Sequence, residues 1–155
     1  MTNEVSTGEN ESYCHANFVN GVEFLKRGMN SQASRCFEMA YEKTTYSDAY
    51  YNKYASFCGY ARVINGDRGG LVICREVARN EQSDGDVFYN LAKSEWYFKD
   101  RKRAVDSLLQ GLQVDGLHEG ICQLCDEMSM RKKTVIGFLP RNHAINNMLG
   151  KFLRK

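Results

Sequence analysis

Two cysteines, Cys122 and Cys125, are the residues whose type and spacing most directly suggest chemistry. On a helix, a spacing of three residues places both sulfur atoms on one face, where they could bind zinc or exchange a disulfide. A structural zinc site takes four ligands, and no second pair of cysteines or histidines has a matching spacing. We therefore interpret the two cysteines as small buried hydrophobic residues, with a metal or redox role as the alternative.

No arrangement typical of a catalytic site is present in the sequence. His15, His118 and His143 are far apart along the chain, and there is no nucleophile elbow. The glycine-rich segment 65–70 lacks the Lys and Ser/Thr of a phosphate-binding loop, and it is better interpreted as a turn between helices. We therefore expect no enzyme activity, no cofactor and no bound metal.

The composition favours a cytoplasmic chain with one folded domain. The 155 residues are 43% hydrophobic and 26% charged, which is ordinary for a globular protein. No apolar run approaches the length of a membrane span, and the first dozen residues are polar, so we expect neither a span nor a secretory signal. In a reducing cytoplasm the six cysteines would remain free thiols.

The charge is unevenly distributed along the chain. From residue 128 onward there are seven basic residues and no acid, so the rest of the chain carries −5 of the formal net charge of +2. A basic end of this kind indicates an interaction segment. The overall pI of about 8.2 is low for a nucleic-acid-binding domain, and we expect neither nucleic acid nor a membrane surface as the partner.

Small and large apolar residues recur with fixed steps of twelve, four and three residues. The three sets are Gly21, Ala33, Phe37 and Ala40 in segment 14–47; Cys58, Gly70, Cys74 and Val77 in segment 51–84; and Ala92, Ala104, Leu108 and Gly111 in segment 85–118. Small residues on a first helix let a second helix approach, and the larger residue fills the space between successive hairpins. The pattern therefore predicts three helical hairpins.

This pattern, with a period near 34 residues, resembles the tetratricopeptide repeat (TPR) over residues 14–118. The resemblance implies an all-α fold in which antiparallel helical hairpins stack in a right-handed superhelix. About three repeats would be followed by a capping helix and a C-terminal helix, as in small bacterial proteins of this type with a basic tail. The chain departs from the family pattern at Asn17, where a large residue is usual, and at Glu95, where an aromatic is expected.

Seven helices are expected, at residues 12–27, 30–43, 47–64, 67–80, 84–98, 101–114 and 117–130. Asp48, Asp67 and Asp84 are the expected N-terminal caps of three of them. We divide the chain into a disordered or frayed segment 1–11, a repeat domain with capping helix at 12–133, and a basic segment 134–155. In this last segment an amphipathic helix would present Ile145, Met148, Leu149 and Phe152 on one face.

The resemblance also implies a binding surface, because the first helices of TPR hairpins line a concave groove that receives extended peptides. The matching positions are Phe18, Val22 and Lys26 in the first copy, Asn52, Ala55, Gly59 and Arg62 in the second, and Tyr89, Lys93, Trp96 and Tyr97 in the third. We expect at least two of the three aromatic residues of the third copy to be exposed. Some family members bind a C-terminal carboxylate there, but Asp86 would repel such a group.

The sequence therefore predicts a non-catalytic interaction scaffold that binds a peptide or helix of another protein in this groove. One alternative is self-association through the C-terminal amphipathic helix, which would give a homo-oligomer. The other alternative is the metal or redox role of Cys122 and Cys125.

Overall fold

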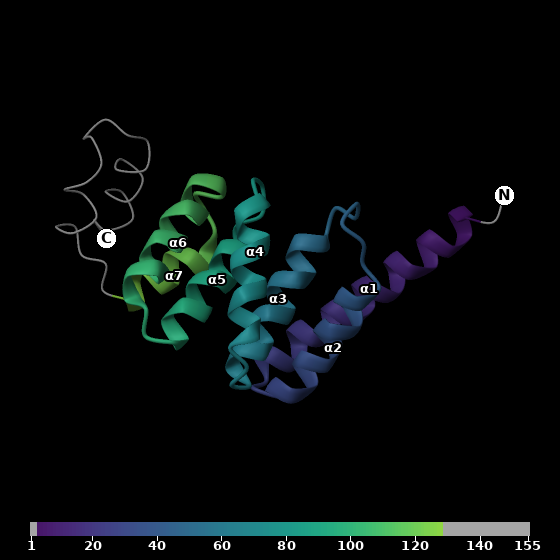
Figure 1. Cartoon of the computed structure of the whole chain (residues 1–155), viewed down its shortest axis with the longest axis horizontal. Helices are drawn as coiled ribbons and strands as arrows, with labels where there is room; N and C mark the ends of the chain where they lie inside the picture. The colour runs from purple at the N-terminus through teal and green to yellow at the C-terminus, as the bar shows by residue number, and fades with distance from the viewer. Residues whose placement is uncertain (1–2, 129–155) are drawn as a thin grey trace.

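The computed structural model describes the backbone of residues 3–128 and the side chains of residues 13–128. Within these residues the helices are α1 (Asn3–Lys26), α2 (Asn30–Glu42), α3 (Tyr51–Ile64), α4 (Gly69–Asn80), α5 (Gly85–Tyr97), α6 (Arg101–Val114) and α7 (Glu119–Glu127). The first six pack as sequential hairpins, and α7 packs on α5 and α6. The hairpins follow one another in chain order from α1 and α2 at one end to α7 at the other (Figure 1). The expected all-α fold of helical hairpins is confirmed.

Two helices begin more than two residues from the expected start, and the other five begin within two residues of it. The first helix begins at Asn3 rather than at residue 12, so most of segment 1–11, which we expected to be disordered or frayed, is helical. The third helix begins at Tyr51 rather than at residue 47, because Asp48 is used in a turn, where its Oδ2 accepts from the Thr45 amide at 2.6 Å.

Of the other two expected caps, Asp84 is an N-cap, whereas the N-cap of α4 is Arg68 rather than Asp67. Asp84 is the N-cap of α5, and its side chain accepts a hydrogen bond from the Asp86 amide. Asp67 accepts from the Gly69 amide at 2.7 Å, at the first residue of α4. The glycine-rich segment 65–70 is the turn between α3 and α4, as expected, and Gly66 has a φ of 91° that a residue with a side chain rarely adopts.

Close helix packing within the first and third hairpins follows the predicted pattern of small residues. A Cβ atom on Gly21 of α1 would lie 2.6 Å from the ring of Phe37 on α2, which is completely buried. In the third hairpin, Ala92 of α5 and Ala104 of α6 are both completely buried in one cluster. These positions therefore need small side chains for the two helices to meet.

The second hairpin follows the pattern one residue later than predicted. Gly59, not Cys58, makes the close approach, because a Cβ on Gly70 would collide with the Gly59 carbonyl oxygen. Cys58 packs instead with Ala33 and Phe37 of the preceding hairpin. The sequence alone could not distinguish the two, since Cys58 and Gly59 are adjacent small residues.

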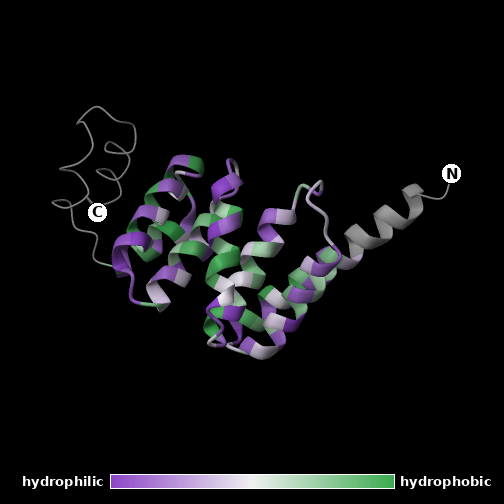
Figure 2. Cartoon of the chain, in the orientation of Figure 1, coloured by the Kyte–Doolittle hydropathy of each residue, from purple (hydrophilic) through white to green (hydrophobic). Residues whose placement is uncertain are grey.

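Buried hydrophobic residues join each hairpin to the next. Figure 2 shows hydrophobic and hydrophilic residues alternating along the helices. Phe18 of α1 lies 4.9 Å, between ring centroids, from both Tyr54 and Phe57 of α3. At the other end of the array, Ile121 and Leu124 of α7 cover the core of the third hairpin. This contact gives α7 the capping position that we expected for the seventh helix.

No helix within residues 3–128 has the length and apolar character needed to cross a membrane. The predicted cytoplasmic location stays a prediction. The expected interaction residues of the C-terminal segment, which are Ile145, Met148, Leu149 and Phe152, lie outside the described residues. The boundary between residues 133 and 134 also lies outside them.

Candidate functional site

Equivalent positions of the second and third hairpins meet where α3 packs beside α5. The Lys53 ammonium lies 2.6 Å from the Asp86 carboxylate, 33 residues along the chain. Asn90 donates a hydrogen bond to the Ser56 hydroxyl at 3.2 Å, 34 residues away. Side chains 33 and 34 residues apart along the chain are therefore in direct contact between α3 and α5.

The surface built on these contacts extends over three helices. Tyr89, Lys93, Trp96 and Tyr97 follow one another at steps of four, three and one, which places them on one side of α5. We call this surface the α3–α5–α7 face, and its members are Lys53, Tyr60, Asp86, Tyr89, Lys93, Trp96, Tyr97, His118 and Glu127.

At one end of the α3–α5–α7 face, Asp86 joins the three helices. It accepts hydrogen bonds from the Lys53 ammonium of α3 and, at 3.0 Å, from His118 Nε2. His118 is the N-cap of α7. His118 Nδ1 accepts from the Ile121 amide, so the ring proton must be on Nε2. Burial would raise the pKa of Asp86, but its hydrogen bonds to Lys53 and His118 outweigh burial and lower it. These groups satisfy one another and hold the helices together.

Lys93, near the middle of the face, has an unusual environment for a lysine. Its ammonium lies 3.9 Å from the ring centroid of Tyr60 and 4.9 Å from that of Tyr89. Burial lowers the pKa of Lys93 to about 8, and the negative charge of Glu127 acts in the opposite direction. None of the ion pairs between described residues includes Lys93. Its charge is therefore held mainly by two aromatic rings, a weaker arrangement than a buried ion pair.

Two large aromatic side chains at the other end of the face are exposed, as expected. Trp96 is 37% exposed and Tyr97 is 45% exposed. The ring of Tyr97 meets the ring of Phe98 edge-on, at 5.3 Å between centroids. Tyr89 is half-buried, because it packs against His118 and Gly120.

The structure brings together the predicted groove residues of the third copy but not those of the first two. Phe18 and Val22 are half-buried against the core between the first two hairpins, and Lys26 is exposed at the end of α1. Asn52 donates to Glu81 Oε2 at 2.9 Å, and Arg62 donates to Glu38 Oε1 at 3.2 Å. Ala55 and Gly59 are buried.

The one-residue shift of α3 accounts for the predicted residues of the second copy that lie elsewhere. Moving the register forward by one replaces Asn52 with Lys53 and Gly59 with Tyr60, which are the residues found on the α3–α5–α7 face. The 33-residue spacing of Tyr60 and Lys93 was the signal that could have found them. His118 and Glu127 had no such signal, because they reach the face only through the way α7 packs on α5.

The cysteines lie mostly in the core. Burial raises the pKa of Cys125 to about 12, and it also raises the pKa of the half-buried Cys122. Thiols in this state are poor nucleophiles and poor metal ligands. Cys14 is 4% exposed because it packs against Ala40 and Tyr54. Among the side chains of residues 13–128, no three metal-binding groups cluster.

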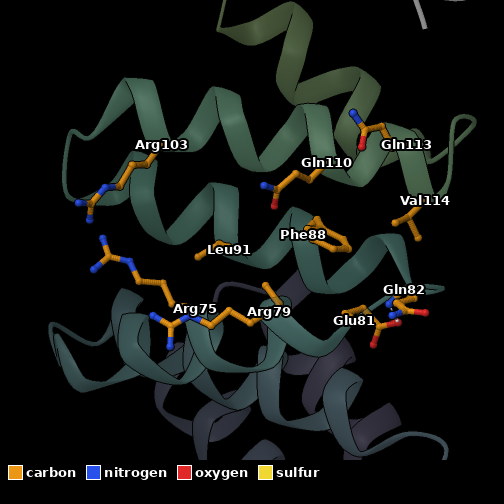
Figure 3. Close-up of a pocket in the computed structure, with 11 residues that line it drawn as sticks. Arg75, Arg79, Glu81, Gln82, Phe88, Leu91, Arg103, Gln110, Gln113 and Val114 are labelled. Carbon is orange, nitrogen blue, oxygen red and sulfur yellow. Dashed lines mark hydrogen bonds between the residues drawn. The ribbon is translucent and has the colours of Figure 1, made fainter. Parts of the chain in front are cut away.

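A shallow hollow of about 840 Å³ lies between α4, α5 and α6, away from the α3–α5–α7 face. Figure 3 shows Arg75, Arg79 and Arg103 at one end of it and Phe88 and Leu91 along its floor. The hollow is not strongly positive in spite of its arginines. Arg75 is paired with the buried Glu95 through two hydrogen bonds of 2.7 and 2.9 Å, and Arg103 is paired with Asp100.

No protein-family model matches the sequence, and no curated protein is detectably similar to it. The functional argument therefore depends on the geometry of the α3–α5–α7 face.

Proposed function

We propose that the chain is a tetratricopeptide-type scaffold that binds a peptide or helix of another protein and has no catalytic role. The hairpins would stack in a right-handed superhelix, with the first helices of the hairpins on its concave side. The α3–α5–α7 face would then be the part of the concave side that receives the partner. Contacts between side chains 33 and 34 residues apart, such as those of Lys53 with Asp86, support this arrangement.

The observation that carries the proposal is the combination of Lys93 with Trp96 and Tyr97. Exposed aromatic side chains provide a large contact area with little loss of conformational freedom, and they dominate binding energy at many interfaces. Here two of them lie within one helical turn of a half-buried cation. A partially desolvated ammonium weakens the fold, so its presence on the face favours a role in binding.

The same features define what the partner must offer. An apolar side chain would stack on the exposed rings of Trp96 and Tyr97. A carbonyl or carboxylate oxygen near Lys93 would accept hydrogen bonds from its ammonium and stabilise the charged form. An extended peptide or a helix presents both kinds of group at suitable spacing.

The test is affinity capture from the native cell with the wild-type chain and two variants. Trp96→Ala should lose the captured partner, with an affinity reduced about 30-fold, which corresponds to about 2 kcal/mol for a central aromatic residue. Val72→Ala is the matched control, because Val72 is an exposed hydrophobic residue of α4 outside the face. Circular dichroism should show unchanged helix content for both variants.

Two results would argue against the proposal. One is that Trp96→Ala and wild type capture the same partner in equal yield. The other is that Val72→Ala loses the partner as completely as Trp96→Ala does, because this would indicate a different binding surface.

A further inference from the structure

A second and more enclosed cavity of about 190 Å³ lies where the segment between α2 and α3 meets α4. Three tyrosines line it: Tyr41 from α2, Tyr46 from the connecting segment and Tyr51 from the first residue of α3. Glu76 of α4 is the only charged residue in its lining. The volume is too small for a drug-sized ligand, which needs roughly 300 Å³ or more, and it suits a single functional group.

The rings of Tyr41 and Tyr46 both pack against the ring of Tyr51. The ring centroids of Tyr41 and Tyr51 are 5.5 Å apart, and those of Tyr46 and Tyr51 are 4.3 Å apart. The hydroxyl groups of Tyr41 and Tyr51 are 3.1 Å apart and share a hydrogen bond. Burial, together with the hydrogen bond to Tyr41, raises the pKa of Tyr51, so this phenol stays neutral.

The charges around the cavity have one sign. Glu76 takes part in none of the ion pairs between described residues, so its carboxylate is available to a ligand. Asn52, also in the lining, uses its amide N–H to hold Glu81, which leaves its carbonyl oxygen as an acceptor. No lysine or arginine is among the lining residues that the structure describes. Ring faces, a carboxylate and a carbonyl all attract a cation.

We infer that this cavity binds an organic ammonium group, such as the head group of choline or of a methylated lysine. Aromatic faces attract such a cation through their quadrupole, most strongly when the cation is desolvated. The ammonium could belong to a small molecule or to a side chain of a protein. The cavity residues are not members of the α3–α5–α7 face, so this inference does not depend on the proposed function.

The first experiment compares choline with 3,3-dimethylbutan-1-ol, its neutral analogue of the same shape, in an NMR titration of the full chain. Choline should shift the signals of the tyrosines of the cavity and saturate, and the neutral analogue should bind at least tenfold more weakly. A peptide with trimethyllysine is the second ligand. If it binds tenfold more tightly than choline, the natural ligand is a protein side chain, and equal affinities indicate a small molecule.

Three variants locate the site. Tyr46→Ala removes a ring that is 83% exposed, so the fold should persist while choline affinity falls about tenfold. Glu76→Gln should weaken choline binding several-fold through loss of charge alone. Tyr50→Ala is the matched control, because Tyr50 is an exposed tyrosine of the same segment that does not line the cavity.

Three results would overturn the inference. The first is no saturable binding of choline or of the trimethyllysine peptide. The second is equal binding of choline and its neutral analogue, which would show an apolar hollow without selectivity for charge. The third is that Tyr50→Ala weakens binding as much as Tyr46→Ala.

Discussion

The ammonium group of Lys93 lowers the stability of the folded chain at neutral pH. Its folded pKa of about 8 lies below the value of about 10.4 for an unfolded lysine, because burial disfavours the charged form. Between these two pH values the unfolded chain binds more protons than the folded chain, so this residue makes stability rise with pH. Its unfavourable contribution is fully present below pH 8 and disappears as the pH approaches the unfolded value.

Replacing this lysine by an apolar residue of similar length should therefore stabilise the fold. We expect Lys93→Met to raise the free energy of unfolding at pH 7 by about 1–2 kcal/mol, a gain reduced by the lost contacts with Tyr60 and Tyr89. The gain should shrink between pH 8 and pH 10. Denaturant unfolding at both ends of this range measures it, and a loss of stability at pH 7 would contradict the prediction.

Lys53→Met provides the opposite case on the same face. Lys53 is paired with Asp86 and Asp84, and although burial acts to lower its pKa, these partners outweigh burial and raise it. The ion pairs of Lys53 therefore stabilise the folded chain at pH 7, and this stabilisation is lost only as the pH rises through the folded pKa of Lys53. The variant should therefore be less stable than wild type at neutral pH.

The sequence could predict the exposed residues of the candidate site better than the buried ones. Trp96 and Tyr97 were identified from the groove positions that the resemblance to the tetratricopeptide repeat implies, and both are exposed. The environment of Lys93 depends on Tyr60 of the preceding hairpin, so it follows only from the register between two helices. The position of α3 in the repeat pattern was predicted one residue too early, at Cys58 instead of Gly59.

At the level of helices, α3 and α4 pack closely at two glycines. Gly59 and Gly70 approach so closely that a Cβ on either one would meet atoms of the facing helix. Gly69, next in sequence to Gly70, has only the side chain of Asp67 near it, and that side chain can move. The two neighbouring glycines therefore form a natural comparison.

We predict that Gly70→Ala lowers the free energy of unfolding by about 2 kcal/mol, because the helices must separate to admit the methyl group. Gly69→Ala should change it by less than about 0.5 kcal/mol, since alanine is the better helix former and space is available. Thermal unfolding of both variants followed by circular dichroism tests this. Equal effects of the two substitutions would show that α3 and α4 are not held at this distance.

Helix positions were predictable to within a few residues because small, apolar and capping residues recur at helical spacing. The starts of α1 and α3 lie more than two residues from the predicted positions, for physical reasons. Residues 3–11 form a helix although they lack an apolar pattern, and Asp48 bonds to a turn rather than to the first turn of α3. Local propensity does not determine which of several nearby groups a short polar side chain will bind.

For the molecule as a whole, a buried ion pair joins the second hairpin to the third, in addition to the pairs of Lys53 with Asp84 and Asp86. Glu95 of α5 has a side chain that is only 3% exposed, and Arg75 of α4 holds both of its carboxylate oxygens. This pair explains the departure from the family pattern at Glu95, where an aromatic residue was expected. The sequence did not indicate that Arg75 would pair with Glu95, because the two residues are twenty positions apart and meet only where two hairpins pack together.

Removing the arginine should uncouple the two halves of the array. We expect Arg75→Ala to cost about 2–4 kcal/mol, because it leaves a buried carboxylate unpaired. In a linear array a weak interface also reduces cooperativity, so α5–α7 should exchange amide hydrogens faster than α1–α3. Arg103→Ala is the control, since its pair with Asp100 is exposed, and it should cost less than about 0.5 kcal/mol. One cooperative transition with uniform exchange in Arg75→Ala would contradict the prediction.

The packing of each hairpin mainly on its neighbours in sequence also governs how the chain reaches this structure. Helices in contact are next to each other along the chain or separated by a single helix, as α3 and α5 are. Closing such short loops costs little entropy, and proteins rich in local contacts fold on the order of microseconds to milliseconds. Any hairpin could form first and serve as the template for the next, so a chain emerging from the ribosome could begin to fold before its C-terminal half is made.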